Sequence, residues 1–308
     1  MPRIKANGIE IEYEEFGSKD DPMLLLVSGF SSQLTRWPES FVQGLAEDAK
    51  RRVVIFDNRD IGLSTEFSNQ VPPAPIDIVK GAATGEPVHE KVPYILDDMA
   101  ADAAALISAL GAEKADVMGF SMGGMIVQLM ALNHPEKVRT VIPVMTTSGD
   151  PTLPRATEEA QKALTAVPEF RSAEAVAEVA VTSQKAIGSA DDVRNSDDHV
   201  RAKAIATFNR SDRPMGVARQ YAAILAQPRW HDRLSSIKHP VLVVHGAIDP
   251  LIPPAGGEDI ARRIPGAELE LVPKWGHDIP EKMVPALLNR IIPFLGKHVP
   301  AEARADVG

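Results

Sequence analysis

Short apolar runs alternate with helical stretches along most of this 308-residue chain, and this alternation limits the folds that it can adopt. Leu24–Val27 is apolar throughout, as expected for a strand buried on both faces of a sheet. Strands that alternate with helices predict an α/β fold, with a mostly parallel central sheet and helices on both faces. The other expected strands are Ile9–Tyr13, Val53–Phe56, Ala115–Phe120, Val138–Met145, Val241–His245 and Glu268–Val272, and the expected helices are Trp37–Ala46, Tyr94–Leu110, Met122–Asn133, Gly257–Ile264 and Lys282–Leu295.

The alternation stops in the middle of the chain. Only helical periodicity is found between Gly149 and about Ser235, over residues 157–167, 173–187, 200–208 and 217–225. An all-helical block inside an α/β chain is typical of a cap inserted over one end of the sheet. The sequence therefore predicts an α/β core of residues 1–148 and 236–299, a helical cap of residues 149–235 and a flexible tail of residues 300–308. Residues 69–93 are rich in proline and glycine, which predicts an excursion with at most one short helix.

One motif in the core carries chemistry. Gly119-Phe120-Ser121-Met122-Gly123 has the form G-x-S-x-G, in which a serine sits on a turn tight enough to project its hydroxyl clear of the backbone. Such a turn needs neighbours without side chains. Here the motif follows an expected strand and opens an expected helix, which is the context that it requires. Ser121 is therefore predicted to be a nucleophile.

A serine hydroxyl is a poor nucleophile at neutral pH and needs a base. In folds with this motif an acid and then a histidine follow the serine along the chain. His277 lies just after the last expected strand, and Asp249 follows the preceding strand, 28 residues earlier. The predicted catalytic residues are thus Ser121, Asp249 and His277, with Asp278 as an alternative acid.

Two further groups of residues are expected near the nucleophile. The developing oxyanion needs two N–H donors, for which the backbone amides of Met122 and Phe30 are the candidates. Asp57 and Asp60 flank Arg59 and are expected to form ion pairs beneath their loop. The side chains expected to contact substrate are Trp37, Met145 and Trp275 of the core and Phe208, Met215 and Tyr221 of the cap, which together suggest an uncharged, hydrophobic substrate.

Composition narrows the possible partners. The formal net charge of −9 argues against nucleic acid or an anionic membrane, because there is no basic excess to neutralise phosphates. The chain has no cysteine, which excludes disulfides, thiol catalysis and thiolate metal sites. The sequence contains no H-E-x-x-H motif, so nothing of this kind indicates a metal site. Because the N-terminus has no apolar stretch of the length that a signal peptide needs, we expect a cytoplasmic protein that acts on a small molecule.

Several motifs carry a resemblance to a known family. They are Leu24–Phe30, Trp37-Pro38-Glu39, Phe56–Ser64, the serine motif, Gly149-Asp150, Asp249-Pro250 and Gly276-His277. With these, the chain resembles the α/β-hydrolase superfamily and, within it, the aclacinomycin methylesterase-like group of bacterial hydrolases. The resemblance implies serine ester hydrolysis without a cofactor. Ser28-Gly29 departs from the His-Gly that many relatives carry, and the excursion at residues 69–93 is longer than in the methylesterase.

The predicted function is hydrolysis of a carboxylic ester through an acyl-enzyme intermediate. The same three side chains could serve a carbon–carbon bond hydrolase, or a cofactor-free perhydrolase or haloperoxidase. A non-catalytic receptor for a small molecule could also retain them. Epoxide hydrolases and haloalkane dehalogenases need an aspartate where this chain has Ser121, which argues against both.

Overall fold

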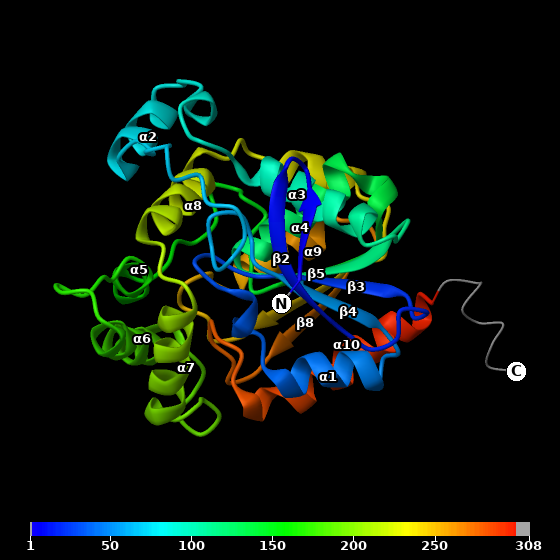
Figure 1. Ribbon diagram of the computed structural model, residues 1–308. Coiled ribbons are helices and arrows are strands. Elements are labelled where there is room, and N and C mark those ends of the chain that lie inside the picture. Colours follow the sequence, from blue (N-terminus) through cyan, green and yellow to red (C-terminus); the bar gives the residue numbers. More distant parts are fainter. Residues whose placement is uncertain (1, 300–308) are drawn as a thin grey trace, which may run out of the picture.

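The computed structural model describes residues 2–299, so the predicted tail of residues 300–308 lies outside the described part (Figure 1). Within residues 2–299 eight strands form one sheet in the order β1-β2-β4-β3-β5-β6-β7-β8. The two pairs β1–β2 and β2–β4 are antiparallel, and from β4 to β8 all neighbouring strands are parallel. The strands are β1 (Arg3–Ala6), β2 (Ile9–Phe16), β3 (Met23–Val27), β4 (Arg52–Phe56), β5 (Ala115–Phe120), β6 (Val138–Val144), β7 (Leu242–Gly246) and β8 (Glu268–Val272).

Helices cover both faces of the sheet because successive side chains of a strand point to opposite faces. In β3, Leu25 and Val27 face a core built with α3 (Leu96–Ala109), α4 (Met122–Asn133) and α9 (Ala255–Arg263). Leu24 and Leu26 face the opposite core, built with α1 (Glu39–Glu47) and α10 (Val284–Lys297). The two helical layers lie above and below the sheet in Figure 1. The predicted α/β-hydrolase architecture, a mostly parallel sheet between two helical layers, is confirmed.

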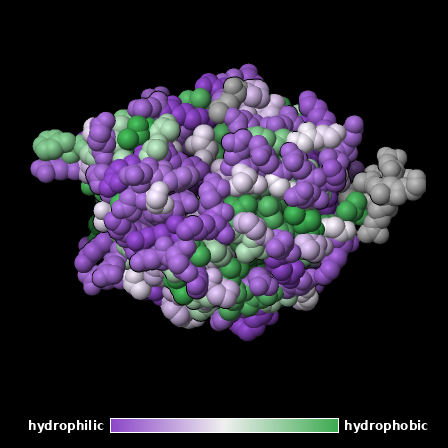
Figure 2. All heavy atoms as spheres, turned by 90° about the horizontal axis from the view of Figure 1, so that it is seen from below, coloured by the Kyte–Doolittle hydropathy of each residue, from purple (hydrophilic) through white to green (hydrophobic). Residues whose placement is uncertain are grey.

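The α1 and α10 side of the molecule is seen from below in Figure 2, where hydrophilic side chains cover most of the surface. On this face, hydrophobic side chains form a patch that runs from the centre of the view toward its right side (Figure 2). Leu288 and Ile292 of α10 are only partly buried against the core on this side. No helix within residues 2–299 is both long enough and apolar enough to cross a membrane.

Four helices are inserted between β6 and β7, and the described residues between these strands contain no strand. They are α5 (Glu158–Leu164), α6 (Ala173–Ile187), α7 (Asp197–Arg210) and α8 (Pro214–Ala226), and they lie together beside one end of the sheet (Figure 1). Thr157, Ser172 and Ser196 begin α5, α6 and α7, since each side chain accepts a hydrogen bond from the backbone N–H three residues on. This insert is the expected helical cap.

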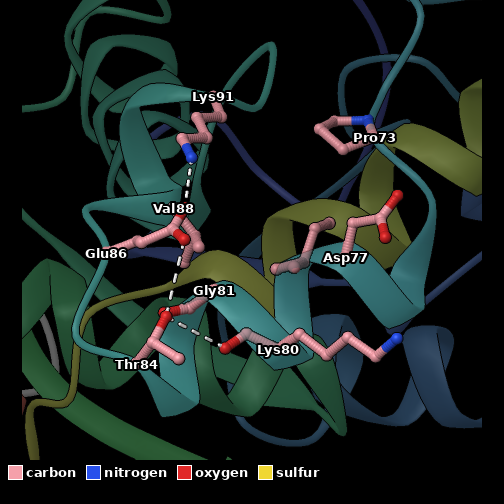
Figure 3. A pocket seen from close by; sticks show the side chains of 9 residues that line it. Pro73, Asp77, Lys80, Gly81, Thr84, Glu86, Val88 and Lys91 are labelled. Atoms are coloured by element: carbon pink, nitrogen blue, oxygen red, sulfur yellow. Dashed lines mark hydrogen bonds and ion pairs between the residues drawn. The ribbon is translucent and has the colours of Figure 1, made fainter.

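The excursion at residues 69–93 forms one short α-helix, α2 (Pro75–Ala83), and a 3₁₀ turn, η2 (Val88–Glu90). Ile78 and Val88 pack against Ala222 and Ala226 of α8, so the excursion rests on the cap. A cavity of about 320 Å³ lies between α2 and η2, and the close-up in Figure 3 shows the hydrogen bond from Thr84 to the Gly81 carbonyl beside it.

Ion pairs join the core to the cap, with partners that differ from the expected ones. Arg59 forms two hydrogen bonds with Asp102 of α3, at 2.6 and 2.7 Å, rather than pairing with its neighbours. Asp57 instead accepts from Arg210 at 2.8 Å, and Asp60 forms two bonds of 2.8 Å with Arg219. The difference arises because the two aspartates face the cap, while the Arg59 side chain turns toward α3.

Candidate active site

Ser121 lies between β5 and α4 in a strained conformation, with φ 58° and ψ −117°. A left-handed φ is costly for a residue with a side chain and is often found at functional sites. The flanking glycines make the turn possible. A Cβ on Gly119 would lie 2.0 Å from the Gly123 carbonyl oxygen, and a Cβ on Gly123 would lie 2.0 Å from the Val27 carbonyl oxygen. Any larger residue would therefore force the backbone of this turn to move.

The three predicted side chains come together in one hydrogen-bonded line. His277 Nε2 lies 2.9 Å from Ser121 Oγ, and His277 Nδ1 lies 2.6 Å from Asp249 Oδ2. Asp249 Oδ1 accepts backbone N–H bonds from Leu251 and Ile252, each at 2.9 Å, which fixes the carboxylate toward the imidazole. A histidine held in this way can accept the proton of a serine hydroxyl.

Two other groups near His277 have different partners. Asp278 Oδ1 accepts from the Ser189 backbone at 3.1 Å and from its hydroxyl at 2.5 Å. His245 is fully buried and lies 3.8 Å from Asp249, and burial lowers the pKa of its imidazole. A neutral His245 leaves the Asp249 charge to act on His277.

The loop after β3 lies directly against the nucleophile, because a Cβ on Gly29 would be 3.3 Å from Ser121 Cβ. The N–H groups of Phe30 and Met122, the predicted oxyanion donors, take part in none of the loop and turn backbone hydrogen bonds in residues 2–299. The Ser28 hydroxyl accepts from Trp37 Nε1 at 3.1 Å. The Ser28 carbonyl accepts from Asn58 at 3.1 Å, so this loop has its own support.

The sequence did not reveal that the cap holds both loops of the site. Gln220 of α8 is fully buried and accepts the N–H of Ser31, which follows Phe30, at 3.1 Å. The His277 N–H donates to the Ile187 carbonyl at 2.6 Å, and the Gly276 N–H donates to Ser189 Oγ at 3.2 Å. A glutamine or a carbonyl in an amphipathic helix has no local signature, so only the tertiary structure identifies these contacts.

A cavity of about 600 Å³ lies between the cap and Ser121. Of the side chains expected to contact substrate, Phe208 and Tyr221 line this cavity, and Tyr221 lies 5.7 Å from Phe30 between ring centroids. Met215 is exposed and does not line the cavity. The remaining three, Trp37, Met145 and Trp275, are buried in the core below the sheet instead. Their places in sequence are next to site residues, but their side chains point into the protein interior.

The chain is similar in sequence and fold to known hydrolases. The chain is 26% identical to a rhodomycin D methylesterase of Streptomyces sp. strain C5, over 90% of this chain and 92% of the relative. It is 25% identical to 3-oxoadipate enol-lactonase 2 of Acinetobacter baylyi, over 87% of each chain. Its fold matches the crystal structure of the enol-lactonase from Burkholderia xenovorans with a TM-score of 0.71 at 23% identity, over 96% of this chain and all of the other. Residues 22–282 match the family profile described as alpha/beta hydrolase fold, and the chain therefore belongs to that family.

Proposed function

We propose that this α/β hydrolase is a serine esterase that cleaves a carboxylic ester of a small molecule through an acyl-enzyme intermediate. The observation that carries the proposal is the 2.9 Å contact between His277 Nε2 and the Ser121 hydroxyl, in line with the Asp249 carboxylate. The similarity to a methylesterase that spans both chains supports an ester substrate. The apolar residues Phe30, Phe208 and Tyr221 on the cavity wall suit the carbon skeleton of such a substrate.

The proposed reaction has two proton transfers in each half. His277 takes the proton of Ser121 as its oxygen attacks the ester carbonyl, and the backbone N–H groups of Phe30 and Met122 bind the resulting oxyanion. The imidazolium, stabilised by Asp249, then gives its proton to the departing alcohol. Water enters, loses a proton to His277 and attacks the acyl-enzyme. As this second intermediate collapses, His277 gives its proton to the Ser121 oxygen, which releases the acid and restores the hydroxyl.

Replacement of Ser121 by Ala tests the proposal. Since the nucleophile is lost while the imidazole and oxyanion donors remain, we expect kcat for p-nitrophenyl butyrate to fall by about 10⁴-fold or more. A fluorophosphonate should label the unchanged protein and not S121A. Ser108→Ala, on α3 and outside the cavity, is the matched control and should keep full activity. A protein that neither turns over esters nor reacts with the fluorophosphonate would indicate a receptor rather than an enzyme.

A further inference from the structure

The cavity above Ser121 is lined by four arginine or lysine side chains, and two of them lie beside a carboxylate. Arg171 pairs with Asp212, and Arg213 lies 3.7 Å from Glu66. Arg36 and Lys203 differ, since neither forms an ion pair with a carboxylate in residues 2–299. Cations without a counter-ion on the wall of a cavity are available to an anionic ligand, and such groups often mark a binding site.

Arg36 and Lys203 approach each other across the boundary between core and cap. Arg36 ends the 3₁₀ turn η1 (Leu34–Arg36) of the core, and Lys203 comes from α7 of the cap. The Lys203 ammonium donates to the Arg36 carbonyl at 3.1 Å. Arg36 as a whole residue is exposed, while the protein atoms around its guanidinium lower its pKa by desolvation. Burial, and then the charge of Arg36, lowers the pKa of Lys203 to about 8.

The charges of two nearby carboxylates act on these cations, and each carboxylate accepts a hydrogen bond from a serine. Asp278 acts on Arg36 from a distance; its Oδ1 is bonded to Ser189, and its buried Oδ2 has no hydrogen-bond partner and makes no ion pair with Arg36. Glu281 acts on Lys203 and accepts from Ser40 Oγ at 2.6 Å. The N–H donors of the guanidinium therefore remain available to a ligand. Because the two carboxylates offset part of the local charge, the pair suits a monoanion better than a dianion.

We propose that Arg36 and Lys203 bind a free carboxylate of the substrate, so that the enzyme acts on esters or lactones that also carry a carboxylate. This inference rests on the proposed esterase function and narrows its substrate class. A guanidinium matches the planar carboxylate with two parallel hydrogen bonds, and the ammonium adds a third donor from the opposite wall. The expectation of an uncharged substrate, drawn from apolar residues alone, gives way to an apolar chain with one charged end.

Two esters of equal length test the preference. p-Nitrophenyl hexanoate and the mono-p-nitrophenyl ester of adipic acid differ only in a carboxylate that replaces the terminal methyl group. The ratio of their kcat/KM values, acid over neutral, should fall about tenfold or more in Arg36→Gln, as expected for the loss of a charge-assisted hydrogen bond. It should fall less in Lys203→Gln. Arg201→Gln removes the same charge from α7 outside the cavity, where Arg201 pairs with Glu178, and should change the ratio less than twofold.

A binding measurement separates this proposal from the proposed reaction. The Ser121→Ala variant should bind adipate in calorimetry, and S121A/R36Q should not. Adipate should also compete with the hexanoate ester in the unchanged protein, which needs no variant to fold. Ester turnover with equal ratios in R36Q and R201Q would overturn the carboxylate site alone. Adipate binding without turnover of any ester would overturn the esterase function alone. Tighter competition by pentyl phosphate than by adipate would replace carboxylate with phosphate as the recognised group.

Discussion

The surroundings of Lys203 bring the pH at which it loses its charge close to neutral. Its pKa is lowered to about 8 by burial and by Arg36, with Glu281 opposing the shift. Below pH 8 the side chain is an ammonium that can donate to an anion, and above pH 8 it loses that charge. The preference for a substrate carboxylate should therefore be larger at pH 7 than at pH 9, because Arg36 alone stays charged.

The measurement is the ratio of kcat/KM for the adipate monoester over the hexanoate ester between pH 6.5 and 9.5. kcat/KM reports ionisations of the free enzyme, so the midpoint of the decline should lie near the pKa of the unliganded lysine, about 8. Lys203→Gln should give a lower ratio that does not change with pH. A decline of the same size in K203Q would assign the titration to another group.

At the scale of elements, helix α8 positions a loop that the proposed chemistry needs. Gln220 accepts the Ser31 N–H at 3.1 Å and donates to the Arg59 carbonyl at 3.1 Å, so it connects the loop after β3 with the loop after β4. Ser31 itself has a left-handed φ of 55°, a conformation that needs external support. The Phe30 N–H is one peptide unit away and depends on the same support.

Gln220→Met should keep the volume of the side chain and remove both bonds. If the Phe30 N–H stabilises the oxyanion, kcat should fall about 10-fold to 100-fold with little change in KM, since the interaction strengthens in the transition state. Gln227→Met, directly after the end of α8, is the matched control, because Gln227 accepts the Asp97 N–H away from the site. An increase in KM with unchanged kcat in Q220M would instead assign Gln220 to substrate binding.

Helices and strands could be predicted from the sequence where a whole run of consecutive residues is buried. The fully buried strands β3 and β4 illustrate this, and so does β5, which leads into the glycine-flanked serine. Strand β1 was not predicted because its four residues pair at the edge and only Ala6 is buried. Helix α7 begins at Asp197 rather than near residue 200, because the Ser196 cap and two aspartates favour an earlier start.

The candidate site divides in the same way. Ser121, Asp249 and His277 each sit at the end of a recognisable strand, and the structure brings them together. Gln220, Arg36 and Lys203 have ordinary local sequences, and their places follow only from how the cap is seated on the core. Trp37 and Trp275 were expected to contact substrate but lie in the core, because nearness in sequence to a site does not fix the direction of a side chain.

At the scale of the whole molecule, the contacts that hold the cap on the core also shape the cavity between the cap and Ser121. Arg219 and Asp60 are both fully buried and joined by two hydrogen bonds of 2.8 Å between α8 and the loop after β4. Arg219 also donates to the Gln70 carbonyl at 2.9 Å, which ties the start of the excursion to the same point. A buried pair of this kind adds little net stability over apolar residues, but the loss of one partner leaves the other charge poorly compensated.

Asp60→Asn should therefore lower the free energy of unfolding by about 3–5 kcal/mol, because the buried Arg219 would keep only the more distant Glu66, at 3.6 Å, as a counter-ion. Urea denaturation measures this. Asp198→Asn makes the same change in an exposed ion pair with Arg201 and should cost less than about 1 kcal/mol. The double variant Asp60→Leu/Arg219→Met removes both charges and should recover most of the loss. A loss below about 1 kcal/mol in D60N would mean that water reaches Arg219, and that the cap is held by its apolar contacts rather than by this pair.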